Sequence, residues 1–118
     1  MDLKGCYEQM GGDYDDVMGR LRQEERVVKF LRRVPDDESF AALKRAMEEE
    51  DWPAAFRAAH SIKGVALTLG LTALAASGSE LTEALRPGQP TREPWELYRA
   101  VEKDYDRTVA AIGALENG

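Results

Sequence analysis

The sequence predicts an all-α protein, an antiparallel up-and-down four-helix bundle with additional short N-terminal helical segments. Apolar residues recur at spacings of three or four along every longer segment, the pattern of a helix with one buried face. No stretch alternates with the period of two that half-buried strands require. Four main helices joined by short connections pack most simply as antiparallel neighbours.

The length of the chain fits one compact domain. It has 118 residues and a mass of 13.1 kDa, which is a typical size for a single domain. Hydrophobic residues make up 43% of the chain and charged residues 32%, so it has enough apolar mass to build a core. Cys6 is the only cysteine, which excludes an intramolecular disulfide and a cysteine-rich zinc site and leaves an ordinary packed or surface thiol.

The N-terminal segment is expected to form short helices that cap one end of the core. Residues 1–10 form the first of these, ended by the glycine pair 11–12, because glycine readily leaves the helical region. Asp13 is placed to cap the next helix, and either Gly19 or Gln23 is expected to divide the following stretch in two. The apolar positions of that stretch are Tyr14, Val17, Met18, Leu21, Val27, Phe30, Leu31 and Val34.

A turn is expected at Pro35, because proline cannot continue a helix, and Asp36 and Asp37 can cap the helix that follows. That helix carries Phe40, Leu43 and Met47 and is expected to end at residues 48–50. Asp51 is placed to cap the central helix, and Pro53 falls in its first turn, where a missing N–H costs nothing.

The central helix has a seam of mostly small residues, which allows neighbouring helices to approach closely. The seam consists of Trp52, Ala55, Ala59, Ile62, Ala66 and Leu69. Gly70 is expected to end this helix, and the next helix repeats the spacing with Leu71, Leu74, Gly78, Leu81 and Leu85. Gly78 costs a helix about 1 kcal/mol relative to Ala, so close packing is the expected reason for it.

The last helix follows a loop at residues 87–90 and begins at Thr91 or Glu93, near Pro94. Asn117 and Gly118 are expected to terminate it. Its buried edge is predicted to consist of Tyr98, Val101, Tyr105, Thr108, Ile112 and Leu115.

The charge of the chain argues against several classes of partner. The net charge is −6 and the pI is near 4.8, whereas nucleic acids and anionic membrane surfaces attract clustered Lys and Arg. No apolar run approaches the ~20 residues that a membrane span needs, and the first residues lack the apolar core of a signal peptide. We therefore expect no nucleic-acid or membrane binding and a cytoplasmic location.

His60 is the only histidine and the best candidate for chemistry. It lies one residue beyond Ala59, off the packing seam, so its ring should face solvent. Arg57, Lys63 and Gly64 lie three or four residues away and are therefore its neighbours on the helix surface. An exposed imidazole offers a nucleophilic nitrogen near neutral pH, and nearby cations can screen a transferring phosphoryl group.

The string from His60 to Gly70, HSIKGVALTLG, resembles the signature of histidine phosphotransfer (HPt) domains, in which His, Lys, Gly and a later Gly keep this spacing. The resemblance extends over residues 24–115 as an HPt-like bundle, with residues 1–23 as an N-terminal helical cap of the same single domain. It implies that His60 is the phosphoacceptor, that Lys63 supports the phosphoryl group, and that Gly64 permits docking of a receiver domain.

The surroundings of the motif contribute further candidate residues. Arg57 is expected to support the phosphoryl group, and the apolar side chains of Phe56 and Leu67 to supply a docking surface. Thr68 stands where many members of the family have Asn, but its hydroxyl can still donate a hydrogen bond near the helix end at Gly70.

The resemblance implies a phosphoryl carrier that is not itself an enzyme. Its partners would be a response-regulator receiver domain and a histidine kinase, which a hybrid protein can carry, and Mg²⁺ would be held by the receiver. No cofactor or metal of its own is expected, and a monomer is the simplest state. The alternative is a non-catalytic helical interaction module, a scaffold or inhibitor that retains the HPt fold. Met1 and the terminal Asn117-Gly118 favour a free-standing domain over a piece of a larger protein.

Overall fold

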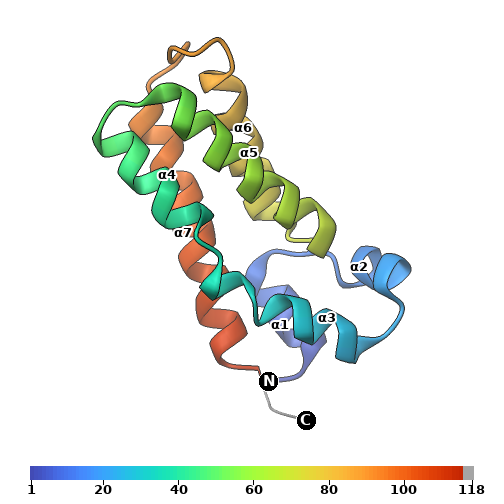
Figure 1. The fold of residues 1–118 in the computed structure, drawn as a ribbon. Helices are drawn as coiled ribbons and strands as arrows, with labels where there is room; N and C mark the ends of the chain where they lie inside the picture. Colours follow the sequence, from blue (N-terminus) through green and yellow to red (C-terminus); the bar gives the residue numbers. More distant parts are fainter. Residues whose placement is uncertain (116–118) are drawn as a thin grey trace.

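The computed structural model describes residues 1–115, and every regular element in that range is helical. Figure 1 shows their arrangement. In chain order the elements are α1 (Leu3–Met10), α2 (Tyr14–Leu21), α3 (Glu24–Leu31), the 3₁₀ helix η1 (Val34–Asp36), α4 (Ser39–Glu48), α5 (Trp52–Leu69), α6 (Thr72–Leu85) and α7 (Pro94–Gly113). None of the helices in this range is long and apolar enough to cross a membrane.

Helices α4, α5, α6 and α7 form the predicted four-helix bundle. Helix α5 packs against α4 and α6, and α6 packs against α7. The ring of Phe40 on α4 stacks between those of Tyr98 and Tyr105 on α7, with centroid distances of 6.0 and 4.3 Å. The short helices α1, α2 and α3 gather at one end of this bundle (Figure 1), so the N-terminal segment covers the end as expected.

The turn predicted at Pro35 interrupts the chain between α3 and α4. Val34, Pro35 and Asp36 form η1, and the Asp37 carboxylate accepts a hydrogen bond of 2.7 Å from the backbone N–H of Ser39. This bond satisfies one of the free N–H groups at the start of α4. The helical path beside α5 is therefore made of three pieces, α3, η1 and α4.

Two helix boundaries go beyond or differ from the expected ones. The break between α2 and α3 falls at Arg22 and Gln23, where Arg22 adopts a φ of 69°, while Gly19 lies inside α2. Helix α7 ends at Gly113 instead of at Asn117 and Gly118, which lie outside the described residues. The expected end was too late, because the chain leaves α7 early enough for Leu115 to be buried in the core.

The N-terminal segment closes the C-terminal end of α5. Gly70 ends that helix in the left-handed conformation, with a φ of 69°. Its carbonyl accepts a hydrogen bond of 2.8 Å from the backbone N–H of Asp13, and the hydroxyl of Tyr7 donates one of 2.6 Å to the Leu69 carbonyl. The last carbonyls of a helix lack partners within the helix, so these bonds fix the end of α5 to the cap.

Gly70 provides a test of this junction. We expect Gly70→Ala to lower the free energy of unfolding by about 1 to 3 kcal/mol, because a Cβ at this left-handed position would lie 2.9 Å from the Asp13 carbonyl oxygen. Gly19→Ala is the matched control, since a Cβ there meets nothing within 4 Å and should stabilise α2 by about 0.5 to 1 kcal/mol. Urea unfolding followed by circular dichroism measures both, and equal effects would contradict the proposed strain.

Candidate functional site

His60 lies in the middle of α5 and is exposed to solvent, as its position off the seam predicted. The opposite side of the helix is buried against α4 and α6, so packing on that side holds the backbone that carries the ring. Five of the six predicted seam residues are buried, and Trp52 is partly buried. At the start of α5, the Asp51 carboxylate accepts a hydrogen bond of 3.2 Å from the backbone N–H of Ala54, as expected of an N-cap.

An aromatic stack holds one face of the His60 ring. The Phe56 ring lies one turn earlier on α5, with its centroid 5.9 Å from that of His60 and the two planes 12° apart. The guanidinium carbon of Arg86, the residue that follows α6, lies 5.2 Å from the Phe56 centroid. Phe56 was expected to serve in docking, but the structure also places it where it limits the orientations of the imidazole.

Arg86 also forms an ion pair with Glu83 of α6. Two hydrogen bonds of 3.0 and 2.5 Å join their side chains. These bonds lower the pKa of the Glu83 carboxyl, and the positive charges of Arg86 and Lys63 act in the same direction against partial desolvation. Neither residue could be assigned to the site from the sequence, because only the packing of α6 on α5 brings them there.

Lys63 lies on the side of α5 that faces α6. Its side chain is half-buried, and a Cβ built on Gly78 would be 3.6 Å from the backbone N, Cα and Cβ of Lys63. Gly78 therefore allows α6 to pass close to Lys63, which is the close packing predicted for this glycine. Lys63 is also close enough to Glu83 for its positive charge to lower the pKa of that carboxyl.

Arg57 lies on the other side of His60. It lines a surface hollow between α4 and α5 together with Arg45, Glu49 and Asp51. Residues six apart on a helix point ~120° away from each other, so Arg57 and Lys63 flank the imidazole from opposite sides. Arg57 lies on the side of α4 and Lys63 on the side of α6, with His60 between them.

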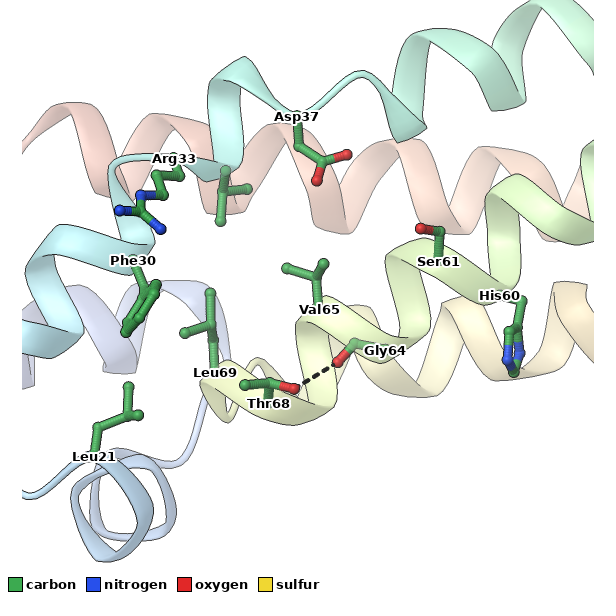
Figure 2. A pocket seen from close by; sticks show the side chains of 11 residues that line it. Leu21, Phe30, Arg33, Asp37, His60, Ser61, Gly64, Val65, Thr68 and Leu69 are labelled. Atoms are coloured by element: carbon green, nitrogen blue, oxygen red, sulfur yellow. Dashed lines mark hydrogen bonds between the residues drawn. The ribbon is translucent and has the colours of Figure 1, made fainter.

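Gly64 leaves a bare patch of backbone one turn after His60. It is exposed, and a Cβ at this position would meet nothing within 4 Å. The Thr68 hydroxyl donates a hydrogen bond of 3.0 Å to the Gly64 carbonyl, four residues earlier on α5 (Figure 2). Thr68 is therefore a hydrogen-bond donor, as predicted. Nearby, Leu67 is 55% exposed, which makes it available to a partner.

Arg20 is a third residue that the sequence did not point to. From α2 it donates hydrogen bonds to the carbonyls of Leu67 at 2.9 Å and Thr68 at 3.0 and 3.1 Å. Asp16 holds the guanidinium with two bonds of 2.8 and 2.7 Å, which lower the pKa of the Asp16 carboxyl. Arg20 lies 47 and 48 residues from these two carbonyls in the sequence, so no local pattern could predict the contact.

Comparison with known protein families identifies this arrangement. The Hpt domain family matches residues 27–111, well over half of the chain. The protein belongs to the Hpt domain family. Members of this family are phosphoryl carriers in phosphorelay signalling. No curated protein and no solved structure matches the chain. Residues 1–26, which include α1 and α2, lie outside the matched range.

The aromatic stack can be tested through the rotamers of His60. We expect Phe56→Leu to leave the fold intact but release the imidazole, because aromatic pairs contribute about 0.5 to 1.5 kcal/mol beyond their buried area. Side-chain coupling constants from NMR should then show averaging of the His60 rotamers, whereas Phe56→Tyr, which keeps the ring, should preserve a single dominant rotamer. Identical rotamer populations in all three proteins would show that the stack does not position His60.

Proposed function

We propose that this Hpt domain is a histidine-containing phosphotransfer protein of a two-component phosphorelay. It accepts a phosphoryl group on His60 and passes it to or from an aspartate of a receiver domain. The observation that carries the proposal is the combination of an exposed imidazole with an open backbone patch at Gly64. A partner's active site can therefore approach the ring without displacing a side chain at position 64.

The proposed reaction moves one phosphoryl group between two side chains. An imidazole nitrogen of His60 attacks the phosphorus of an aspartyl phosphate on the receiver. A nitrogen–phosphorus bond forms as the oxygen–phosphorus bond breaks, and the aspartate departs as a carboxylate. The imidazole nitrogen that attacks carries no proton, and the reverse transfer follows the same path. No oxidation or reduction takes place.

The residues around His60 supply charge and access. Lys63 and Arg57, placed on opposite sides of the ring, offset the negative charge of the transferring group, a reaction that depends mainly on positioning and electrostatics. Phe56 limits the rotation of the ring and thus the entropy lost on reaction. The receiver brings its own aspartate and Mg²⁺, and a histidine kinase loads the relay upstream. We place this exchange in the cytoplasm.

The transfer can be tested directly. We expect a radiolabelled receiver phosphate or an active histidine kinase to label the wild-type protein with an acid-labile phosphoryl group, because phosphohistidine is unstable in acid. His60→Gln should remain folded and unlabelled, and Lys44→Gln, a change on exposed α4 surface, should label like wild type. Absence of label from several competent donors would favour the alternative, an interaction module that acts by binding alone.

The proposed role of Lys63 in supporting the phosphoryl group can be tested separately. We expect Lys63→Ala to slow phosphotransfer about tenfold or more, since a cation beside the phosphoryl group is lost. Thermal stability should change by less than about 0.5 kcal/mol, because Ala keeps the Cβ that packs near Gly78. Lys63→Arg should restore part of the rate, and Lys103→Ala, on exposed α7 surface, should leave it unchanged. A transfer rate for Lys63→Ala equal to wild type would exclude this role.

A further inference from the structure

A row of three side chains leads from His60 to the end of α6. The Phe56 ring lies 5.9 Å from the His60 ring and nearly parallel to it, and the Arg86 guanidinium carbon lies 5.2 Å from the Phe56 centroid. Arg86 and His60 are both exposed. An arginine side chain is long and has several rotatable bonds, so the guanidinium can move toward the imidazole without a change in the backbone.

Glu83 binds the Arg86 guanidinium while His60 is unmodified. The two side chains form a two-point ion pair, with hydrogen bonds of 3.0 and 2.5 Å. Both side chains are about half exposed, Arg86 at 51% and Glu83 at 55%. An exposed ion pair is weak because water screens the attraction between its charges. A more highly charged group nearby can therefore displace Glu83 from the guanidinium.

A phosphoryl group on His60 is such a competitor. It brings ~2 negative charges and three acceptor oxygens, against the single charge and two oxygens of a carboxylate. Arginine can bind a phosphate group through two parallel N–H bonds, as it binds a carboxylate. The guanidinium can therefore exchange the Glu83 carboxylate for the phosphoryl group without losing the two-point geometry.

Glu83 lies close enough to the proposed phosphoacceptor to act on it as well. The Arg86 hydrogen bonds lower the pKa of the Glu83 carboxyl most, and the charges of Lys63 and of a protonated His60 lower it further. Electrostatic interactions are mutual, so a carboxylate that is affected by charge at these positions repels a phosphoryl group carried by the imidazole. Glu83 therefore opposes the phosphorylated state.

The side of α5 that faces α3 and η1 offers apolar surface instead. A groove lies there, lined by the apolar side chains of Leu21, Phe30, Val34, Val65 and Leu69. The exposed residues Arg33 and Asp37 stand at its rim with opposite charges. In Figure 2 the His60 ring points away from both of them. The charged groups that can act on a phosphoryl group from a neighbouring helix therefore come from the α6 side.

We propose that Arg86 is a further phosphoryl-binding cation beside Lys63, and that Glu83 binds its guanidinium until His60 is phosphorylated. The phosphoryl oxygens then replace the Glu83 carboxylate as the partner of Arg86, and no covalent bond changes in this exchange. The proposal rests on the phosphotransfer function described above and extends it to the lifetime of the phosphohistidine. Arg86 prolongs that lifetime, and Glu83 shortens it.

The half-life of the phosphohistidine in water tests the proposal without a partner protein. Phosphoramidate can load an imidazole nitrogen directly and releases ammonia, and hydrolysis then returns the imidazole and inorganic phosphate. We expect Arg86→Gln to shorten the half-life of phosphorylated His60 about two- to fivefold, the effect of losing an exposed ion pair. Glu83→Gln should lengthen it by a similar factor. Glu96→Gln and Arg99→Gln, on exposed α7 surface, are the charge-matched controls and should keep the wild-type half-life.

Nitrogen NMR of the arginine side chains separates phosphoryl binding by Arg86 from a purely structural role against Phe56. The Arg86 Nε–H donates to Glu83 in the unmodified protein, so its resonance should shift when phosphoramidate loads the wild type. The Arg99 resonance should stay in place. Arg86→Lys, which keeps the charge but not the two-point fork, should restore part of the half-life that Arg86→Gln loses.

Failure of this proposal can be told apart from failure of the proposed function. If neither phosphoramidate nor any receiver labels His60 in the wild-type protein, the phosphotransfer function itself fails. If His60 is labelled but the Arg86 resonance does not move, or both α6-side variants keep the wild-type half-life, only the role of Arg86 and Glu83 is overturned. Circular dichroism melts confirm that each variant is folded.

Discussion

The packing of α5 between its neighbours is the constraint on which the rest of the structure depends. Its buried side consists largely of alanines, which let α4 and α6 approach closely. At the α6 contact, Gly78 lets the two backbones pass side by side near Lys63. This packing holds the buried side of α5 in place. His60 projects from the opposite, exposed side.

The second constraint is the end of the same helix. A helix of this length leaves carbonyl groups without partners at its C-terminus, and Tyr7, Asp13 and Arg20 all bond to that region. Burial raises the pKa of the Tyr7 hydroxyl, so it stays a hydrogen-bond donor over the physiological range. The N-terminal cap and the bundle are therefore joined by polar contacts as well as by apolar packing.

The surroundings of His60 differ on its two sides. Toward α6 lie Lys63 and the ion pair of Glu83 with Arg86, which form a charged boundary. Toward α3 and η1 lies an apolar groove with a mixed rim. One side of the imidazole is therefore charged, and the other is largely apolar. Gly64, at the junction, keeps the approach to the ring open.

The sequence by itself determined the helices, most of their ends and the exposed position of His60, because these follow from local rules. The spacing of apolar residues selects the buried side of α5, and the caps at Asp13, Asp51 and Gly70 depend on neighbours within a few positions. The close packing at Gly78 was also foreseen, since a glycine inside a helix needs a compensating contact.

Only the tertiary structure decided which distant side chains meet at the site. Glu83 and Arg86 reach His60 because α6 turns back along α5, and Arg20 reaches the Thr68 carbonyl across 48 residues of chain. The same holds for the groove that Leu21 helps to build. These contacts depend on the angles and distances between packed helices, which no local spacing encodes.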